Sequence, residues 1–423
     1  MNLMMILRQL WNQRAANGWI LGELVVVTYF LWGVVDPVYV LLSDKALPDH
    51  YDLTDTYLLS IGEYSTNHTK YKPEMASDSL KRIDFMRVVD QVRRYPGVSN
   101  VTVSLFNSYP QSGGWNGGQV FNDTILAYSQ QMTFLSGTDY FGVFRIHDAR
   151  TGQIPPVLAE GEQGIYLTPD LAEKLFGEKY PQNKWVHWGD TTRKFPLTTI
   201  IDPVQIRSNN QPGPLIFKTT SELKHLPRRV RICFRVRDGL ASPVFTETFK
   251  REMRPRMQIG NYYLASLTDF RTESKNFEYY MGTTGTIRLQ TILALFFLLC
   301  VFLGMGGTFW LRCNARREEI GLYMAMGSNR HRLVRQFLFE AWWMVTIAFV
   351  VRALVQLQIV YLNGFAFPPD NPTPDYIQNR PVLHFLIVSV ISYVLILAVS
   401  FVATYIPVSK AARMNPADAL GDE

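Results

Sequence analysis

The stretch TILALFFLLCVFLGMGGTFWL, at Thr291–Leu311, is an unbroken apolar run without a charged residue. About 20 such residues form a helix long enough to cross the hydrocarbon core of a bilayer. Three further apolar runs of similar length lie at Ile20–Leu42, Leu338–Leu362 and Val382–Ile406. The sequence therefore predicts an integral membrane protein.

The first apolar run is expected to stay in the protein as an anchor. It is longer than the apolar core of a signal peptide, it contains Glu23, and no small-residue cleavage site follows it.

A long segment of ordinary soluble composition, residues 43–288, separates the first two apolar runs. Runs rich in β-branched and aromatic residues predict strands, and helical spacing of apolar residues predicts helices between them. One helix has Thr168 as its expected N-cap and Gly177 past its end. The expected fold class is a membrane protein with four transmembrane α-helices and a large α+β extracytoplasmic domain inserted between the first and second helices. Strands are expected at Tyr57–Ser60, Val98–Leu105 and Arg229–Val236, and helices at Ile83–Arg94 and Asp170–Phe176.

Basic residues predict the orientation of the chain in the membrane. They cluster between the second and third runs, and others lie near both termini. Positive residues on short loops stay in the cytoplasm. We therefore expect a multi-pass protein of the bacterial inner membrane with both termini cytoplasmic and the large domain periplasmic. The net charge of +6 then reflects topology, and no nucleic-acid partner is expected. The clustered basic residues are Arg312, Arg316, Arg317, Arg330, Arg332 and Arg335.

These signals divide the chain into nine parts. Residues 1–17 are expected to form a cytoplasmic amphipathic helix, the alternative being the cytoplasmic end of the first span. The core domain is expected to consist of an outer α+β unit, at about 43–110 and 224–288, with a second unit inserted at about 111–223. The expected parts are the helix at 1–17, transmembrane helices at 18–42, 289–312, 338–362 and 382–406, the periplasmic core domain at 43–288, a cytoplasmic coupling loop at 313–337, a periplasmic loop at 363–381 and a cytoplasmic tail at 407–423.

No catalytic or metal-binding motif is present in the sequence. It contains no phosphate-binding loop, no H-E-x-x-H pair and no G-x-S-x-G elbow. The three cysteines provide no disulfide framework for the outer domain. We therefore expect no enzyme activity, no catalytic or metal-binding residue and no cofactor in this chain.

The segment RREEIGLYMAMGSNRHRLVRQFLFEA, at Arg316–Ala341, predicts two short helices separated by a break at Gly327. Ile320, Tyr323 and Met324 fall on one face of the first helix. A short helix with one apolar face suits insertion into a groove on a soluble partner. The alternative is an interfacial helix that rests on lipid headgroups.

This segment resembles the cytoplasmic loop of the FtsX/MacB-type permease family, the mechanotransmission class of ABC transporters. The C-terminal stretch PVSKAARMNPADAL resembles the closing motif of the same family, and residues 140–146, 164–177 and 230–238 resemble its periplasmic core domain more loosely. The resemblance assigns ATPase coupling to Glu319, Ile320, Gly321, Met324, Ala325, Gly327, Phe337 and Glu340. The matching residues of the closing motif are Pro407, Ala411, Asn415, Pro416, Ala419 and Leu420.

The resemblance implies a permease subunit that is driven by a separate cytoplasmic ABC ATPase of the MacB, LolD or FtsE kind. ATP and Mg would bind to that ATPase, whose work would move the periplasmic domain to export or extract a peptide, lipid-linked or hydrophobic substrate. Further expected partners are membrane lipids, a second permease copy or paralogue and, in an efflux machine, a periplasmic adaptor and outer-membrane channel. The alternative is a division-type signalling or scaffold subunit that regulates an extracytoplasmic enzyme, but such relatives carry a much smaller outer domain.

The third apolar run contains Arg352, and an intramembrane arginine is costly unless it faces a partner or a cavity. Asp36, in the first run, lies at a depth that Arg352 could reach. The alternative is that Arg352 extends to the outer headgroups, which the sequence alone favours.

Overall fold

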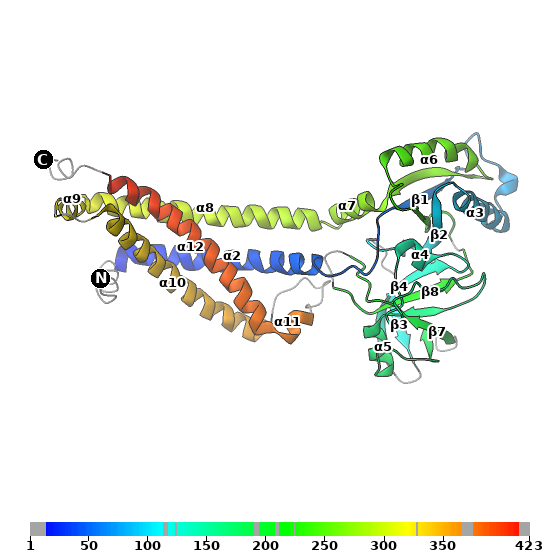
Figure 1. Ribbon diagram of the computed structural model, residues 1–423, viewed down its shortest axis with the longest axis horizontal. Coiled ribbons are helices and arrows are strands. Elements are labelled where there is room, and N and C mark those ends of the chain that lie inside the picture. Colours follow the sequence, from blue (N-terminus) through cyan, green and yellow to red (C-terminus); the bar gives the residue numbers. More distant parts are fainter. Residues whose placement is uncertain are drawn as a thin grey trace. The chain divides into compact units, whose positions relative to one another are not determined.

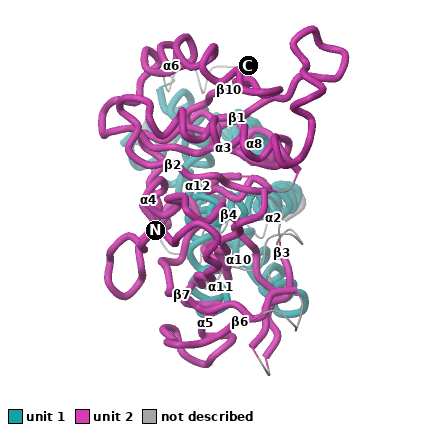
Figure 2. The backbone as a smooth tube through the Cα atoms, turned by 90° about the vertical axis from the view of Figure 1, so that its right-hand side faces the viewer, with its two compact units in different colours: residues 1–43, 285–423 teal, residues 44–284 magenta. Residues whose placement is uncertain are grey.

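The structure is a computed structural model (Figure 1), and it describes residues 14–112, 117–122, 125–189, 194–207, 211–223, 225–326, 329–364 and 375–413. The chain folds into two compact units, which Figure 2 distinguishes by colour. One unit is helical and comprises residues 1–43 and 285–423. The other is an α/β unit of residues 44–284.

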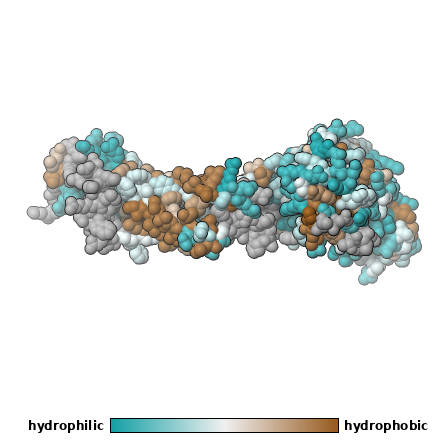
Figure 3. Space-filling model, turned by 90° about the horizontal axis from the view of Figure 1, so that it is seen from below, coloured by the Kyte–Doolittle hydropathy of each residue, from teal (hydrophilic) through white to brown (hydrophobic). Residues whose placement is uncertain are grey.

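Four helices of the described chain are long and apolar enough to cross a membrane. Each of the four expected spans lies within one of them, which confirms the predicted number of transmembrane helices. Hydrophobic atoms gather along the helical unit in Figure 3, as lipid-facing side chains require. The helices of this part of the chain are α2 (Arg14–Lys45), α8 (Thr283–Ala315), α9 (Arg317–Ala325), α10 (Arg330–Asn363), α11 (Asp375–Asn379) and α12 (Pro381–Ala411).

The helical unit has a continuous apolar interior made by α2, α8, α9, α10 and α12. Leu31 of α2, Phe309 of α8 and Ala341 of α10 are fully buried within it. Small residues allow close approach: a methyl group on Gly304 of α8 would collide with the carboxylate of Glu23 on α2. The helices therefore pack as one body.

The α/β unit is built on a single ten-stranded sheet with the order β10-β1-β9-β2-β4-β3-β6-β7-β5-β8. Most neighbours pair antiparallel, whereas β4 with β8 and β5 with β7 pair parallel. The strands are β1 (Thr56–Glu63), β2 (Val98–Leu105), β3 (Gly117–Phe121), β4 (Leu126–Leu135), β5 (Ile165–Leu167), β6 (Trp185–Trp188), β7 (Lys194–Ile200), β8 (Leu215–Thr220), β9 (Val230–Val236) and β10 (Tyr262–Asp269).

Helices cover the sheet on both faces near β1 and β9, because alternate residues of a strand point to opposite sides. Tyr57 and Phe234 pack into a core with α3 and α6. Their neighbours Leu58 and Cys233 pack into a different core with α4. The helices of this unit are α3 (Asp78–Arg93), α4 (Tyr140–Phe144), α5 (Pro169–Phe176), α6 (Pro243–Arg256) and α7 (Phe270–Tyr280), with the 3-10 turn η1 (Pro73–Met75).

The expected strands and helices of this domain lie on β1, β2, β9, α3 and α5. The expected inserted unit, residues 111–223, supplies β3–β8 and a core with α5. That unit is not separate, however, because its strands continue the sheet of the outer unit through the pairing of β2 with β4. Thr168 occupies the N-cap position of α5, but its hydroxyl accepts a hydrogen bond from the Leu215 amide instead of capping the helix. Gly177 ends α5 with a positive φ of 72°.

The expected coupling segment, residues 313–337, contains the end of α8 at Ala315, the helix α9 and the start of α10 at Arg330. The expected amphipathic helix falls largely outside the described residues, and residues 14–17 belong to α2.

Candidate functional site

The first candidate site is the short helix α9, which lies in the sequence between the transmembrane helices α8 and α10. Asn329 is the N-cap of α10, and its side chain accepts a hydrogen bond from the His331 amide. From there α10 runs without a break to Asn363, as the sequence predicts for a second helix that continues into the third span. The predicted glycine break, Gly327, and Ser328 lie outside the described residues.

One face of α9 is buried in the helical unit. Ile320 is only 5% exposed and belongs to the same core as Leu333 and Phe337. The expectation that Ile320 presents itself to a partner is therefore wrong. The physical reason is the edge-to-face contact between Phe309 and Phe337, because the core around these rings leaves Ile320 no exposed position.

The opposite face of α9 carries exposed apolar and acidic side chains. Leu322 is 53% exposed and Met326, one helical turn on, is 77% exposed. Glu318 and Glu319 are also exposed. The side chains of Tyr323 and Ala325 lie outside the description. Leu322 and Met326, the residue that follows α9, are thus exposed apolar residues of this segment that the sequence analysis did not select.

Two further predicted coupling residues are internal. Phe337 and Glu340 of α10 are 2% and 3% exposed. The carboxylate of Glu340 lies 3.9 Å from the Arg312 guanidinium on α8. These residues join helices within the unit, and their side chains are buried rather than on its surface. Gly321 is likewise buried, whereas Glu319 is exposed and Met324 is half-buried.

The C-terminal motif is described only in its first part. Pro407 and Ala411 are buried on α12. They pack inside the helical unit rather than on its surface, so their role in the structure is internal packing. Asn415, Pro416, Ala419 and Leu420 lie outside the described residues.

A second candidate site is a polar cluster inside the helical unit. Asp36 of α2 and His384 of α12 are buried, with their Oδ1 and Nε2 atoms 2.6 Å apart. The guanidinium of Arg352 on α10 lies over the Trp32 ring at 4.9 Å from the ring centre. Arg352 is 1% exposed, so the expectation that it extends to the headgroups is wrong. The proposed direct pair with Asp36 is not formed either, because His384 occupies that carboxylate.

His384 is the residue of this cluster that the sequence analysis missed. A lone ionisable residue in an apolar run was the available signal, since intramembrane histidines are rare and usually have a partner.

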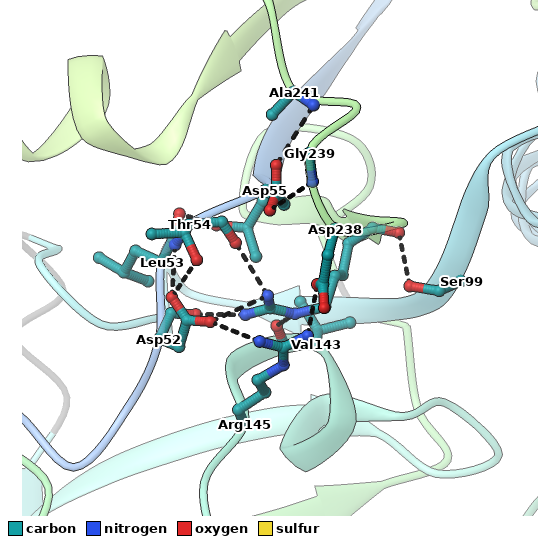
Figure 4. A network of polar contacts seen from close by, with 12 residues as sticks. Asp52, Leu53, Thr54, Asp55, Ser99, Val143, Arg145, Asp238, Gly239 and Ala241 are labelled. Atoms are coloured by element: carbon teal, nitrogen blue, oxygen red, sulfur yellow. Dashed lines mark hydrogen bonds and ion pairs between the residues drawn. The ribbon is translucent and has the colours of Figure 1, made fainter.

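The third candidate site is a network of charges in the α/β unit, at the point where the chain arrives from α2. Arg235 of β9 is 2% exposed and its guanidinium donates to the Asp52 carboxylate at 3.2 Å. The same guanidinium donates to the main-chain carbonyls of Asp52, Thr54 and Val143. Arg145, at the end of α4, bridges Asp52 at 3.0 Å and Asp238 at 2.5 Å. Figure 4 shows Asp52, Arg145 and Asp238 gathered in this way.

Hydrogen bonds and charge hold Asp52 in its ionised form. Partial burial alone would raise the pKa of this carboxyl group. Hydrogen bonds from the hydroxyl and amide of Thr54, together with Arg235 and Arg145, outweigh burial and hold the pKa below its usual value. Asp52 is thus a permanent anion at neutral pH.

Asp55 extends the attachment to the loop after β9. Its carboxylate accepts hydrogen bonds from the amides of Gly239 and Ala241, and its carbonyl accepts one from Val236. A pocket of about 440 Å³ borders the network and includes Arg145, Arg235 and Asp238 in its lining. The segment Asp52–Asp55 is therefore attached at several points to β9 and the loop that follows it. The sequence analysis did not find this network, because it joins residues that are far apart in the chain.

No group of three or more histidine, cysteine, aspartate or glutamate residues that could hold a metal ion is found among the described residues. Fold and sites together define a class: a polytopic membrane protein with a four-helix membrane unit and a large α/β domain inserted between its first two spans.

Comparisons with known proteins identify the family within this class. Residues 291–416 match the family model "FtsX-like permease C-terminal". The macrolide export ATP-binding/permease protein MacB of Neisseria gonorrhoeae is 23% identical over 276 residues, which covers 62% of this chain and 39% of that protein. MacB of Bordetella avium is 28% identical over 338 residues, which covers 78% of this chain and 44% of that protein. Residues 291–416 thus match the FtsX-like permeases, and the chain as a whole is similar to MacB-type permease proteins.

Two solved structures were also matched. The periplasmic region of MacB from Actinobacillus actinomycetemcomitans aligns with 53% of this chain and 93% of its own length, at 13% identity and a TM-score of 0.33. The extracellular domain of the ABC-type transporter YknZ from Gram-positive bacteria aligns with 50% of this chain and all of its own, at 13% identity and a TM-score of 0.31. The chain spans about two fifths of the length of the first curated relatives it matches.

Proposed function

We propose that this chain is the permease subunit of an ABC transporter and converts ATP hydrolysis by a cytoplasmic ATPase into movement of its α/β domain. The work would drive export or extraction of a peptide, lipid-linked or hydrophobic substrate. The observation that carries the proposal is the match of residues 291–416 to the permease family, with α9 lying between two spans inside that match. The curated relatives are named as ATP-binding and permease proteins together. We place ATP and Mg on a partner ATPase, because the residues of this chain contain no phosphate-binding loop.

The exposed face of α9 is the proposed contact with the ATPase. Leu322 and Met326 supply an apolar stripe on this face, and Glu318 and Glu319 add negative charge beside it. An amphipathic helix of this kind binds by placing its apolar side chains in a groove of the partner. The buried face, through Ile320, would transmit the movement into the helical unit.

Movement would reach the α/β domain through its two chain connections. The first follows α2 at Lys45, and the second precedes α8 at Thr283. Because the charge network holds Asp52–Asp55 against β9, a displacement of the first connection would move the domain as a rigid body.

Replacing Leu322 and Met326 together by aspartate is expected to abolish most ATPase binding. Two buried apolar contacts at the centre of an interface typically contribute more than about 2 kcal/mol, which corresponds to at least a roughly thirtyfold weaker complex. The measurement is co-purification of the partner ABC ATPase with the tagged full-length chain.

The matched control for this experiment is Leu240→Asp together with Val244→Asp. These are also exposed apolar residues, 42% and 75% exposed, but they belong to the α/β unit. Undiminished co-purification with the α9 variant, at normal yield and thermal stability, would rule out this face as the ATPase contact.

The proposed orientation places α9 in the cytoplasm and the α/β unit in the periplasm of a bacterial inner membrane. The arginines around α9 favour this orientation by the positive-inside rule. A protease added to intact spheroplasts is expected to cut within residues 44–284 and to spare residues 316–335. Cleavage within residues 316–335 alone would contradict the proposed topology. Lysed spheroplasts serve as the control for the accessibility of both segments to the protease.

The assembly is proposed to contain two permease chains and two ATPase chains. The second permease would be a copy of this chain or a paralogue, in contact with membrane lipids. In an efflux machine, a periplasmic adaptor and an outer-membrane channel would complete the assembly.

A further inference from the structure

The polar cluster of the helical unit contains one carboxylate and two groups that can pair with it. Asp36 and Trp32 are four residues apart on α2 and therefore lie on the same helix face. His384 on α12 is bonded to Asp36. Arg352 on α10 lies against Trp32. The cluster thus joins three helices around Asp36.

The Arg352 guanidinium lacks a hydrogen-bond acceptor within the part of the chain that the structure describes. Among the described residues, none accepts from its Nε, Nη1 or Nη2 atom. The side chain is nevertheless among the largest that are fully buried. The Trp32 ring offsets part of the cost through its negative face. A buried cation without a hydrogen-bond acceptor remains strongly unfavourable. This cost favours a second arrangement in which an anion pairs with the guanidinium.

Asp36 is the anion that can do so, because it lies one helical turn from Trp32 on the same face of α2, and the Arg352 guanidinium lies over the Trp32 ring. We propose that Asp36 is a shared counter-ion that exchanges between two partners, His384 and Arg352. The structure shows the state in which α2 is bonded to α12. In the other state the carboxylate turns to the guanidinium, with which it can form two parallel hydrogen bonds, and α2 is bonded to α10.

The exchange gives α2 two alternative attachments. Both partners are buried, so each state keeps the carboxylate paired and the helical unit closed. The exchange would change which helix is bonded to α2 nine residues before its end at Lys45. Packed helices that have two discrete arrangements are the kind of element that transmits a conformational change. The inference does not depend on the ATPase partner.

The test is a double-mutant cycle on the full chain, measured as SDS-induced unfolding in mixed micelles. His384→Gln alone is expected to lower the folding equilibrium constant less than about tenfold, because Asp36 turns to Arg352. Arg352→Gln alone is expected to have a similarly small effect, because Asp36 keeps His384. The double variant leaves Asp36 without either partner. Its folding equilibrium constant should therefore lie at least about tenfold below the value expected from multiplying the two single effects.

Rescue separates pairing from packing. His384→Gln with Arg352→Lys keeps a cation and is expected to return close to the His384→Gln value. The control is Ser392→Ala on α12, a fully buried hydroxyl that donates to the Val388 carbonyl of its own helix. Its combination with Arg352→Gln should be additive.

A fixed Asp36–His384 pair predicts a different pattern. In that case His384→Gln alone would cause the whole loss, and neither Arg352→Gln nor Arg352→Lys would change it further. That result would overturn the proposal. If the double glutamine variant yields no folded protein, His384→Gln decides the question. The proposal requires the His384→Gln variant to fold, so its failure to fold would overturn the proposal.

Discussion

Replacement of Arg235 by leucine is expected to lower the free energy of unfolding of the α/β unit by roughly 3–5 kcal/mol. The guanidinium is 2% exposed and donates to the Asp52 carboxylate and to three main-chain carbonyls. Its removal takes this donor from the three main-chain carbonyls, which costs more than the bonds themselves contribute, whereas the Asp52 carboxylate keeps its bonds to Thr54 and Arg145. The measurement is urea unfolding of the purified chain, with hydrogen exchange of the β1 and β9 amides as the local readout.

The control for Arg235→Leu is Arg237→Leu. Arg237 lies two residues further along the chain and is exposed, so the same chemical change should alter stability by less than about 0.5 kcal/mol. Equal stability of the two variants would mean that the network does not hold Asp52–Asp55 in place. The proposed rigid transmission from the first chain connection would then lose its support.

Replacement of Phe337 by alanine is expected to destabilise the helical unit by roughly 3–5 kcal/mol, the usual range for a buried aromatic residue. The ring is 2% exposed and packs edge-to-face against Phe309 of α8, with their centres 6.2 Å apart. The cavity would form in the core that also buries Ile320 of α9. The expected result is a lower midpoint of SDS-induced unfolding, accompanied by weaker ATPase co-purification because α9 loses its support.

The comparison variant is Phe296→Ala on α8, where the side chain is 56% exposed. It removes the same atoms from a surface position and should leave the midpoint nearly unchanged. Phe337→Ala with normal stability but lost ATPase binding would contradict the structure, because Phe337 would then have to face the partner. The pair Leu322 and Met326 is expected to behave in the opposite way, with normal stability and lost binding.

Patterns within short windows of sequence were sufficient for much of the architecture. The four apolar runs predict four helices because a span must satisfy its main-chain hydrogen bonds internally, and this requirement depends on local composition. The strand at Val98–Leu105 has the same bounds in the structure as in the prediction. The expected inserted unit, residues 111–223, supplies β3–β8 of one continuous sheet. Whether β4 continues the sheet of β2 depends on pairing between distant strands, which no local pattern encodes.

The candidate coupling residues show the same limit. Helical spacing identified Ile320, Tyr323 and Met324 as one face of a helix, but spacing cannot say whether an apolar face meets a partner or the protein's own core. The core around Phe309 and Phe337 decided this for Ile320. Among the described side chains of this segment, Leu322 and Met326 are the exposed apolar ones.

The sequence by itself determined the membrane class, the number of spans and the inserted domain, because these follow from apolar length and composition along the chain. Only the tertiary structure decided which charged residues meet. Asp36 is hydrogen-bonded to His384 rather than to Arg352, and Arg235 is hydrogen-bonded to Asp52; both pairs are far apart in the sequence. Buried charges take the partner that packing brings within hydrogen-bond distance, and that distance is a property of the folded chain alone.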